Sequence, residues 1–198
     1  MSFHPPCRLT AQVFTTTLLL STIACSVQNG SLPSVKSGAA EATEPTIFNC
    51  VEQEGNWVTV PQRGNATSTQ PLMTWGTREF GDKYTPKQRC QIVSRKLTDV
   101  VGNNGGRLKG LALTTGKLDN GYTVVCVVME GKETCNQDNF LFTLNRDNAK
   151  NPGVVLAKIN NFADGKAGDN KIEESGELPE VVSLENLVNR ALPEGNGF

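Results

Sequence analysis

The stretch GYTVVCVVMEGKETCNQDNFLFTL, residues 121–144, decides the fold. Residues 122–129, YTVVCVVM, are apolar at successive positions, so both faces of this segment are expected to be buried, as in a central strand. Residues 139–145, NFLFTLN, are expected to form its antiparallel neighbour. Cys126 and Cys135 have eight residues between them. This pair has four possible interpretations: a metal site, a redox pair, a nucleophile with a helper, or a disulfide.

The segment before this stretch carries the clearest helix signal. Thr85 is suited to the N-cap, and Pro86 is suited to the first helical position. Apolar residues recur at spacings of 3, 4 and 3, which predicts a main helix over about 86–101 with one apolar stripe made of Cys90, Val93, Leu97 and Val100. Lys87, Arg89, Arg95 and Lys96 lie off that stripe. Gly102, with the asparagines that follow it, is expected to end the helix.

Short strands are expected on either side of this helix. TIFNCVE (46–52) and WVTVP (57–61) predict a hairpin around the turn at 54–56. PLMTW (71–75) predicts a third strand, and RLKGLALTTG (107–116) predicts another.

The C-terminal part adds two expected helices. NPGVVLAKINNFA predicts a second helix over about 152–163 with Val155, Ile159 and Phe162 on one face. Residues 164–178 read as a charged linker. SLENLVNRAL (183–192) predicts a last helix with Ser183 as its cap, which packs either on the domain or on a partner; its apolar stripe is Leu184, Leu187, Val188 and Ala191. The fold class predicted is therefore α+β: a small antiparallel sheet with one main helix packed on it, a second helix, and disulfides that staple the domain.

The N-terminus is typical of an exported chain. The apolar run Val13 to Ala24 is too short for a stable membrane anchor, and residues 1–24 fit a signal peptide. The sequence STIAC resembles a bacterial lipobox, which makes Cys25 a candidate for lipidation, although Thr22 stands where the motif usually has Leu. Ordinary signal-peptidase cleavage near Ala24 is the alternative. Residues 25–45 have the composition of a flexible linker, and residues 46–163 are expected to form the folded domain.

Several kinds of chemistry are excluded by residue type. The only histidine, His4, lies in the expected leader, so histidine-dependent triads and histidine-ligated zinc are not expected. Ser94 and Lys96 are two residues apart on the predicted helix and point in different directions, so they cannot form a Ser–Lys pair. The sequence DGKAGDNKIEES (164–175) resembles a calcium loop but lacks the required acidic residues. We therefore expect no catalytic residues, no metal site and no cofactor.

Four cysteines remain in the expected mature domain: Cys50, Cys90, Cys126 and Cys135. An even number of cysteines in an exported chain predicts disulfides, and four allow three pairings. Their spacing lacks the two short knuckles of a four-thiolate zinc site and the C-x-x-C of a thioredoxin-like motif. Cys90 points at the core from its helix, and Cys50 shares a strand face with Phe48, so we favour the pairs Cys50–Cys90 and Cys126–Cys135.

Five blocks of this sequence resemble the cyanobacterial circadian oscillating polypeptide family. They are FNC (48–50), LMTWGTREF (72–80), YTPKQRCQIVSRKL (84–97), LTTGKLDNGYTVVC (113–126) and LFTL (141–144). The resemblance covers residues 47–163. It implies a periplasmic or membrane-surface protein whose abundance follows the daily cycle. The family has no established activity or catalytic residues, so no site residue is implied.

These observations favour a non-enzymatic domain of unknown molecular role, exported to the periplasm or to the outer face of the plasma membrane and held there by a lipid on Cys25. Its expected partners are the membrane and an unknown protein or ligand. With a formal net charge of −1 it has no basic excess, so nucleic acid is not an expected partner. A secreted enzyme inhibitor that presents the clamped loop VVMEGKET (127–134), or a hydrolase that uses carboxylates alone, is the alternative. For Trp57, Trp75, Phe80 and Tyr84, core packing is favoured over an aromatic binding surface.

Overall fold

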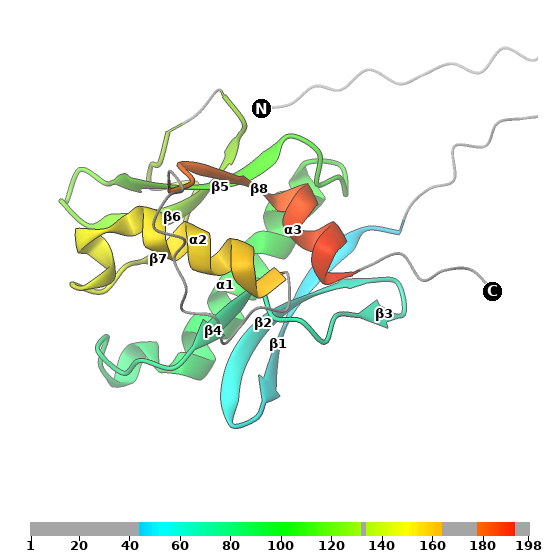
Figure 1. Ribbon diagram of the computed structural model, residues 1–198, viewed down its shortest axis with the longest axis horizontal. Helices are drawn as coiled ribbons and strands as arrows, with labels where there is room; N and C mark the ends of the chain where they lie inside the picture. The colour runs from blue at the N-terminus through cyan, green and yellow to red at the C-terminus, as the bar shows by residue number, and fades with distance from the viewer. Residues whose placement is uncertain (1–43, 132–133, 164–177, 193–198) are drawn as a thin grey trace, which may run out of the picture. The chain divides into compact units, whose positions relative to one another are not determined.

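A computed structural model describes residues 44–131, 134–163 and 178–192, and it contains two antiparallel sheets and three α-helices in that part of the chain (Figure 1). The first sheet is built around β2, which pairs with β1 along its whole length and with β3 and β4 on its other side. Its strands are β1 (Thr46–Gln53), β2 (Asn56–Arg63), β3 (Ala66–Thr67) and β4 (Met73–Trp75). In Figure 1 this sheet lies at the bottom.

The second sheet lies at the top of Figure 1 and has the order β7-β6-β5-β8, with every pair antiparallel. Its strands are β5 (Leu111–Lys117), β6 (Thr123–Met129), β7 (Phe140–Thr143) and β8 (Val181–Ser183). The prediction that residues 122–129 form a central strand is confirmed, because β6 has a partner on each side.

The side chains of β6 explain why its sequence is apolar throughout. Val125 and Val127 point into the main core, whereas Cys126 and Val128 belong to a second, smaller buried cluster. Successive residues of a strand face opposite sides of the sheet. Both sides of β6 are therefore covered, and an alternating pattern of polar and apolar residues is not needed.

The three helices are α1 (Pro86–Asn103), α2 (Pro152–Ala163) and α3 (Leu184–Ala191), with short 3₁₀ turns at η1 (Asp82–Tyr84) and η2 (Asn148–Lys150). The predictions of a main helix over about 86–101 and of a second helix over 152–163 are confirmed. Thr85 forms a capping box at the start of α1: its hydroxyl accepts from the backbone N–H of Gln88, and the Gln88 side chain accepts from the backbone N–H of Thr85.

One expectation differs from the structure at the level of the sheet. The sequence predicts a single small sheet, whereas the strands form two four-stranded sheets. Side chains of both sheets and of all three helices enter one main core, for example Phe48 from β1, Leu97 from α1 and Leu187 from α3. Hydrophobic pattern predicts which face of a strand is buried, and that requirement is met equally well by two sheets facing one core.

Two predicted helix stripes are shifted by about one residue. Val101 is fully buried at the end of α1, whereas Val100, which was expected there, is only partly buried. In α2 the buried residues are Leu156, Ile159 and Ala163, while Val155 and Phe162 are half-buried. The main core surrounds each helix over a wider arc than the single line that the spacing indicates.

The folded unit continues beyond residue 163. β8 pairs with β5, and α3 contributes the fully buried Leu184, Leu187 and Val188 to the main core. Ser183 caps α3, since its hydroxyl accepts from the backbone N–H of Asn186. The sequence left open whether the last helix packs on the domain or on a partner. In the structure, α3 packs on the domain.

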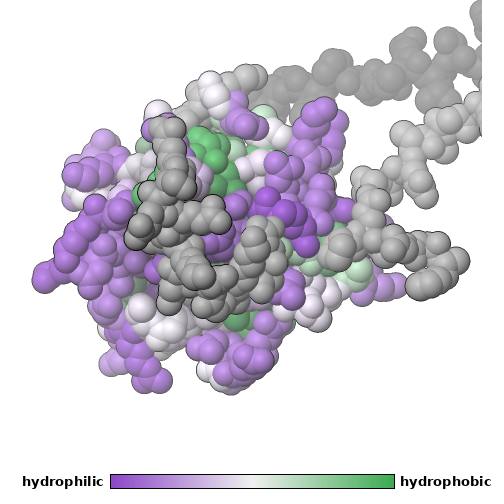
Figure 2. Space-filling view, viewed as in Figure 1, coloured by the Kyte–Doolittle hydropathy of each residue, from purple (hydrophilic) through white to green (hydrophobic). Residues whose placement is uncertain are grey.

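Residues 164–177, which hold most of the expected charged linker and the calcium-like loop, lie outside the described residues, as do the expected leader, Cys25 and the linker up to residue 43. The face of the molecule in Figure 2 is mainly hydrophilic, and hydrophobic residues show in a few small areas.

Candidate ligand-binding site

Both disulfides favoured from the sequence are present. Cys50–Cys90 joins β1 to α1, and Cys126–Cys135 joins β6 to the segment before β7. The second bridge lies directly on β5: a Cβ atom placed on Gly116 would come 2.9 Å from the Cys135 sulfur and 2.8 Å from the Cys135 Cβ. Residues 132 and 133 of the clamped loop lie outside the described residues.

The aromatic residues singled out from the sequence divide between core and surface. Trp75 is buried and donates through Nε1 to the Thr59 hydroxyl at 3.0 Å, so core packing is confirmed for it. Trp57 is half-buried, with the Lys87 ammonium 4.8 Å from its ring centroid. For Tyr84 the expectation is wrong, because 44% of this residue is exposed.

Tyr84 lies in an open groove that gathers five aromatic side chains, including both tyrosines of the chain. Its volume is about 470 Å³, within the usual range for small-molecule sites. We call it the aromatic groove; its lining is Phe80, Tyr84, Arg89, Ile92, Val93, Lys96, Leu118, Asn120, Tyr122, Gln137, Phe140, Leu141, Phe142 and Thr143. Among the described residues five large hydrophobic side chains are strongly exposed, and three of them line this groove: Tyr84, Ile92 and Tyr122.

Helix α1 provides one wall of the aromatic groove. Arg89, Ile92, Val93 and Lys96 occupy relative positions 0, 3, 4 and 7, which lie on one face of a helix. Much of the remaining lining comes from β7 and from the turn between β5 and β6, which carries Tyr122. Tyr122 is the most exposed of the lining aromatic residues, at 61%.

Lys96 is the cation at one end of this helix face. Its ammonium lies 3.7 Å from the Phe140 ring centroid and donates to the backbone carbonyls of Phe140 at 2.8 Å and Leu141 at 3.5 Å. The side chain is partly buried, and burial lowers its pKa from the usual lysine value. Its contacts keep the ammonium at the wall of the groove.

Arg89 lies at the other end of the face of α1 that lines the aromatic groove. Its guanidinium donates to the carbonyls of Tyr84 and Thr77 and to the Thr77 hydroxyl, and lies 5.0 Å from the Phe80 ring centroid. These contacts attach the loop after β4 to α1. Burial lowers the pKa of Arg89, and the nearby Glu79 carboxylate partly offsets this effect.

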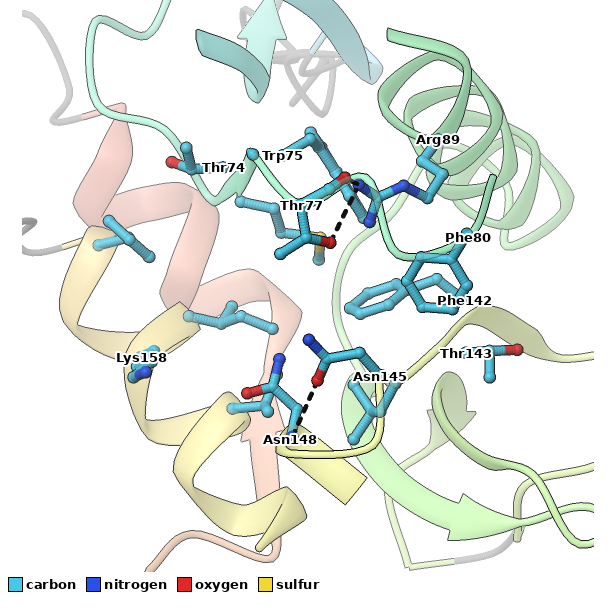
Figure 3. Close-up of a pocket in the computed structure, with 16 residues that line it drawn as sticks. Thr74, Trp75, Thr77, Phe80, Arg89, Phe142, Thr143, Asn145, Asn148 and Lys158 are labelled. Carbon is cyan, nitrogen blue, oxygen red and sulfur yellow. Dashed lines mark hydrogen bonds between the residues drawn. The ribbon is translucent and has the colours of Figure 1, made fainter. Parts of the chain in front are cut away.

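A smaller cavity of about 160 Å³ adjoins the aromatic groove and shares Phe80, Arg89, Phe142 and Thr143 with it. Figure 3 shows this cavity, with Arg89 directed toward Thr77 on one side and Asn145 beside Asn148 on the other. The Phe142 ring meets Trp75 edge to face, with centroids 5.1 Å apart. Two of the four residues shared by the hollows are therefore aromatic, Phe80 and Phe142.

Charge in the aromatic groove has one sign. Its lining contains Arg89 and Lys96 but no aspartate or glutamate. The one salt bridge found among the described residues, Lys150–Asp147, lies elsewhere on the surface. The groove is thus an apolar and aromatic surface with positive charge, a combination suited to a ligand that is apolar over most of its surface.

Sequence reasoning assigned Arg89 and Lys96 only to the polar side of α1. Their spacing with Ile92 and Val93 indicates a second, mixed face of the helix, and this pattern can be read from the sequence alone. The sequence does not predict that Tyr122, Phe140 and Phe80 converge, because these residues are distant from one another along the chain. Ser94 and Lys96 do diverge as expected: Ser94 donates to Thr59 inside the core, and Lys96 faces the groove.

The described part of the chain contains neither a cluster of metal ligands nor a helix that could span a membrane. In residues 44–131, 134–163 and 178–192, no three or more His, Cys, Asp or Glu side chains are grouped so that they could hold a metal ion. Within the same ranges, no helix combines the length and the apolar character that crossing a membrane requires.

Comparison with known proteins gives one family. The family model described as circadian oscillating protein COP23 matches residues 47–189, which is most of the chain. This chain belongs to the COP23 family. No curated protein and no solved structure matches it. The COP23 match extends beyond the resemblance seen at residues 47–163: it includes β8 and most of α3, and it contains every residue that lines the aromatic groove.

Proposed function

We propose that this COP23-family protein is an exported, non-enzymatic binding protein held at a membrane surface, and that the aromatic groove holds its ligand. The observation that carries the proposal is the convergence of five aromatic side chains from distant segments on one open groove of about 470 Å³. A molecule with a large apolar or aromatic surface fits this lining best.

The exposure of the groove supports a binding role. When an apolar partner covers water-exposed aromatic side chains, the complex is stabilised by roughly 25 cal/mol for each Å² removed from water. Tyr84, Ile92 and Tyr122 all line this groove, whereas the other strongly exposed apolar side chains of the described residues, Ile47 and Val181, lie outside it. Concentration of exposed apolar area in one place is characteristic of an interaction site.

Export is supported by two independent features. The first is the leader-like segment 1–24, followed by Cys25 and a linker composition. The second is the pair of disulfides, since stable disulfides are typical of oxidising compartments. A lipid on Cys25 would hold the domain at the membrane while the linker lets the aromatic groove face the solvent.

A fluorescence titration with N-phenyl-1-naphthylamine, an uncharged aromatic probe, tests the groove. We expect saturable binding at one site, and Tyr122→Ala should weaken it by about tenfold because a large stacking surface is lost. Val181→Ala is the matched control, since Val181 is 44% exposed but lies outside the groove, and it should leave the affinity unchanged. Absence of saturable binding, or equal losses in the two variants, would refute the binding role.

Membrane fractionation of cells tests the tether. Wild-type protein is expected to stay with the membranes through a high-salt wash, and Cys25→Ser should release it into the soluble fraction. A wild-type protein that washes off in salt and behaves like Cys25→Ser would show that Cys25 carries no anchor.

A further inference from the structure

One N–H group of the Lys96 ammonium has no hydrogen-bond acceptor among the described residues. A lysine ammonium has three N–H donors. Two are directed to the carbonyls of Phe140 and Leu141, and no third acceptor occurs in the part of the chain that the structure describes. Since Lys96 lines the aromatic groove, an acceptor on a bound ligand can take the remaining donor.

Among the residues that the structure describes, no carboxylate forms an ion pair with Lys96. Arg89, on the same face of α1, has the Glu79 carboxylate nearby, which raises its pKa against the effect of burial. For Lys96 burial is the one cause of its lowered pKa, and no carboxylate lines the groove. A partly buried ammonium without a nearby anion is a place where an incoming anion is stabilised strongly.

From this arrangement we infer that the aromatic groove selects an amphipathic organic anion: a ligand with one carboxylate or sulfonate group, bound by Lys96, on a flat aromatic or apolar body. This inference rests on the proposed binding function and specifies the class of ligand. The anionic group lies beside Phe140, where Lys96 is held 3.7 Å from the ring centroid. The body covers the exposed rings of Tyr84 and Tyr122.

The spacing on α1 favours a single anion at this end of the groove. Lys96 is seven residues after Arg89, so the two residues are about 10.5 Å apart along the helix axis. The Arg89 guanidinium already donates to Thr77 and to the Tyr84 carbonyl. One anionic group therefore pairs with Lys96, while the ligand body extends toward Arg89 and the Phe80 ring.

Two fluorescent probes with almost the same body separate charge from apolar contact. 8-Anilinonaphthalene-1-sulfonate carries a sulfonate, and N-phenyl-1-naphthylamine lacks it. We expect the wild-type protein at pH 7 to bind the sulfonate probe at least about tenfold more tightly, because a hydrogen bond to a charged group is made in addition to the shared apolar contact. Lys96→Met should abolish this preference, and Lys96→Arg should retain most of it.

Lys87→Met is the matched control. Lys87 is on the same helix and lies over an aromatic ring, Trp57, but it is outside the aromatic groove. The variant removes the same charge and the same type of contact, so the preference for the sulfonate probe should remain at the wild-type value. An equal loss in Lys87→Met and Lys96→Met would mean that the preference comes from net charge, and would overturn the inference.

The pKa of Lys96 gives a readout that does not depend on a substitution. In protein with ¹³C-labelled lysine, NMR titration should show a higher pKa for Lys96 when the sulfonate probe is bound, and no change with the uncharged probe. If Lys96→Met fails to fold, this titration and Lys96→Arg decide the question. Equal affinity of wild-type protein for both probes overturns the inference but leaves the binding function standing, whereas the absence of binding by either probe refutes both.

Discussion

At the scale of the residue, the main core contains a small polar centre that no sequence pattern indicates. The Thr59 hydroxyl accepts from Trp75 Nε1 at 3.0 Å and bonds with the Ser94 hydroxyl at 3.1 Å, and Thr59 is fully buried. These bonds join β2, β4 and α1 beside the Cys50–Cys90 bridge. They fix the position of Trp75, which is part of the wall of the Figure 3 cavity.

Thr59→Val is expected to lower the free energy of unfolding by about 1–3 kcal/mol, because the buried indole N–H of Trp75 loses its acceptor. Urea denaturation measures the loss. In the double variant with Trp75→Phe, the added cost of Thr59→Val should be smaller, since the orphaned donor is then absent. Strict additivity of the two substitutions would contradict the assigned bond.

Glu54→Asn is expected to stabilise the protein by about 0.5–1 kcal/mol. Glu54 has a φ of 49° and Gly55 a φ of 76°, so both residues of the β1–β2 turn are left-handed, and asparagine tolerates this conformation better than glutamate. Thermal denaturation should show a rise of a few degrees. Glu52→Asn, placed within β1, is the control and should give no rise because asparagine is a poor strand residue.

Stability at alkaline pH should depend on Lys96. Its pKa is lowered by burial in the folded protein and ordinary in the unfolded chain, so the unfolded chain binds more protons between these two values. Unfolding free energy should therefore rise with pH across that alkaline window. In Lys96→Met the rise should be reduced; urea denaturation at several pH values compares the two proteins, and identical pH profiles would contradict the assignment.

At the scale of the element, α1 connects most parts of the domain. Its inner face carries Cys90 and Leu97 into the core, and its outer face carries Arg89 and Lys96 into the aromatic groove. The main helix was predictable because cap, periodicity and stop signals agree over its length. The outer face was not recognised, since a stripe that mixes cations with apolar residues also describes an ordinary solvated helix surface.

Thr85→Ala should lower the free energy of unfolding by about 1 kcal/mol, because the Gln88 backbone N–H at the start of α1 loses its acceptor. Circular dichroism during urea denaturation provides the measurement. Thr85→Ser keeps the hydroxyl and should remain within a few tenths of a kcal/mol of wild type. A loss in Thr85→Ser as large as that in Thr85→Ala would show that the methyl group, not the cap, is responsible.

At the scale of the whole molecule, local pattern predicted the α+β class and the cysteine pairs, but not the division into two sheets or the aromatic groove. Cys90 and Cys50 were paired from the direction of their side chains, which depends on local periodicity alone. The groove depends on the meeting of Tyr84, Tyr122 and Phe140, and such long-range contacts are decided by the packing of the entire core. Length and periodicity carry no information on that meeting.

The two disulfides should differ in their effect on overall stability. In the loop-closure model, the Cys50–Cys90 bridge, with a sequence separation of 40, stabilises by about 4 kcal/mol, and the Cys126–Cys135 bridge, with a separation of 9, by about 2.7 kcal/mol. Replacing each pair by alanines and measuring urea denaturation tests this order. A larger loss for the shorter bridge would show that local packing on Gly116 outweighs chain entropy.

The place of β8 and α3 sets the order in which this protein can mature. β8 (Val181–Ser183) pairs with β5 in the second sheet, and Leu184 and Leu187 enter the main core, yet both elements come long after β5 and β6 in the order of the chain. An emerging chain therefore keeps β5 without its β8 partner, and the core without α3, until these later elements have also been synthesised. Under the export proposed above, this delay would be an advantage, because a chain that still lacks β8 and α3 would stay loose enough to pass through a membrane and would close its core afterwards.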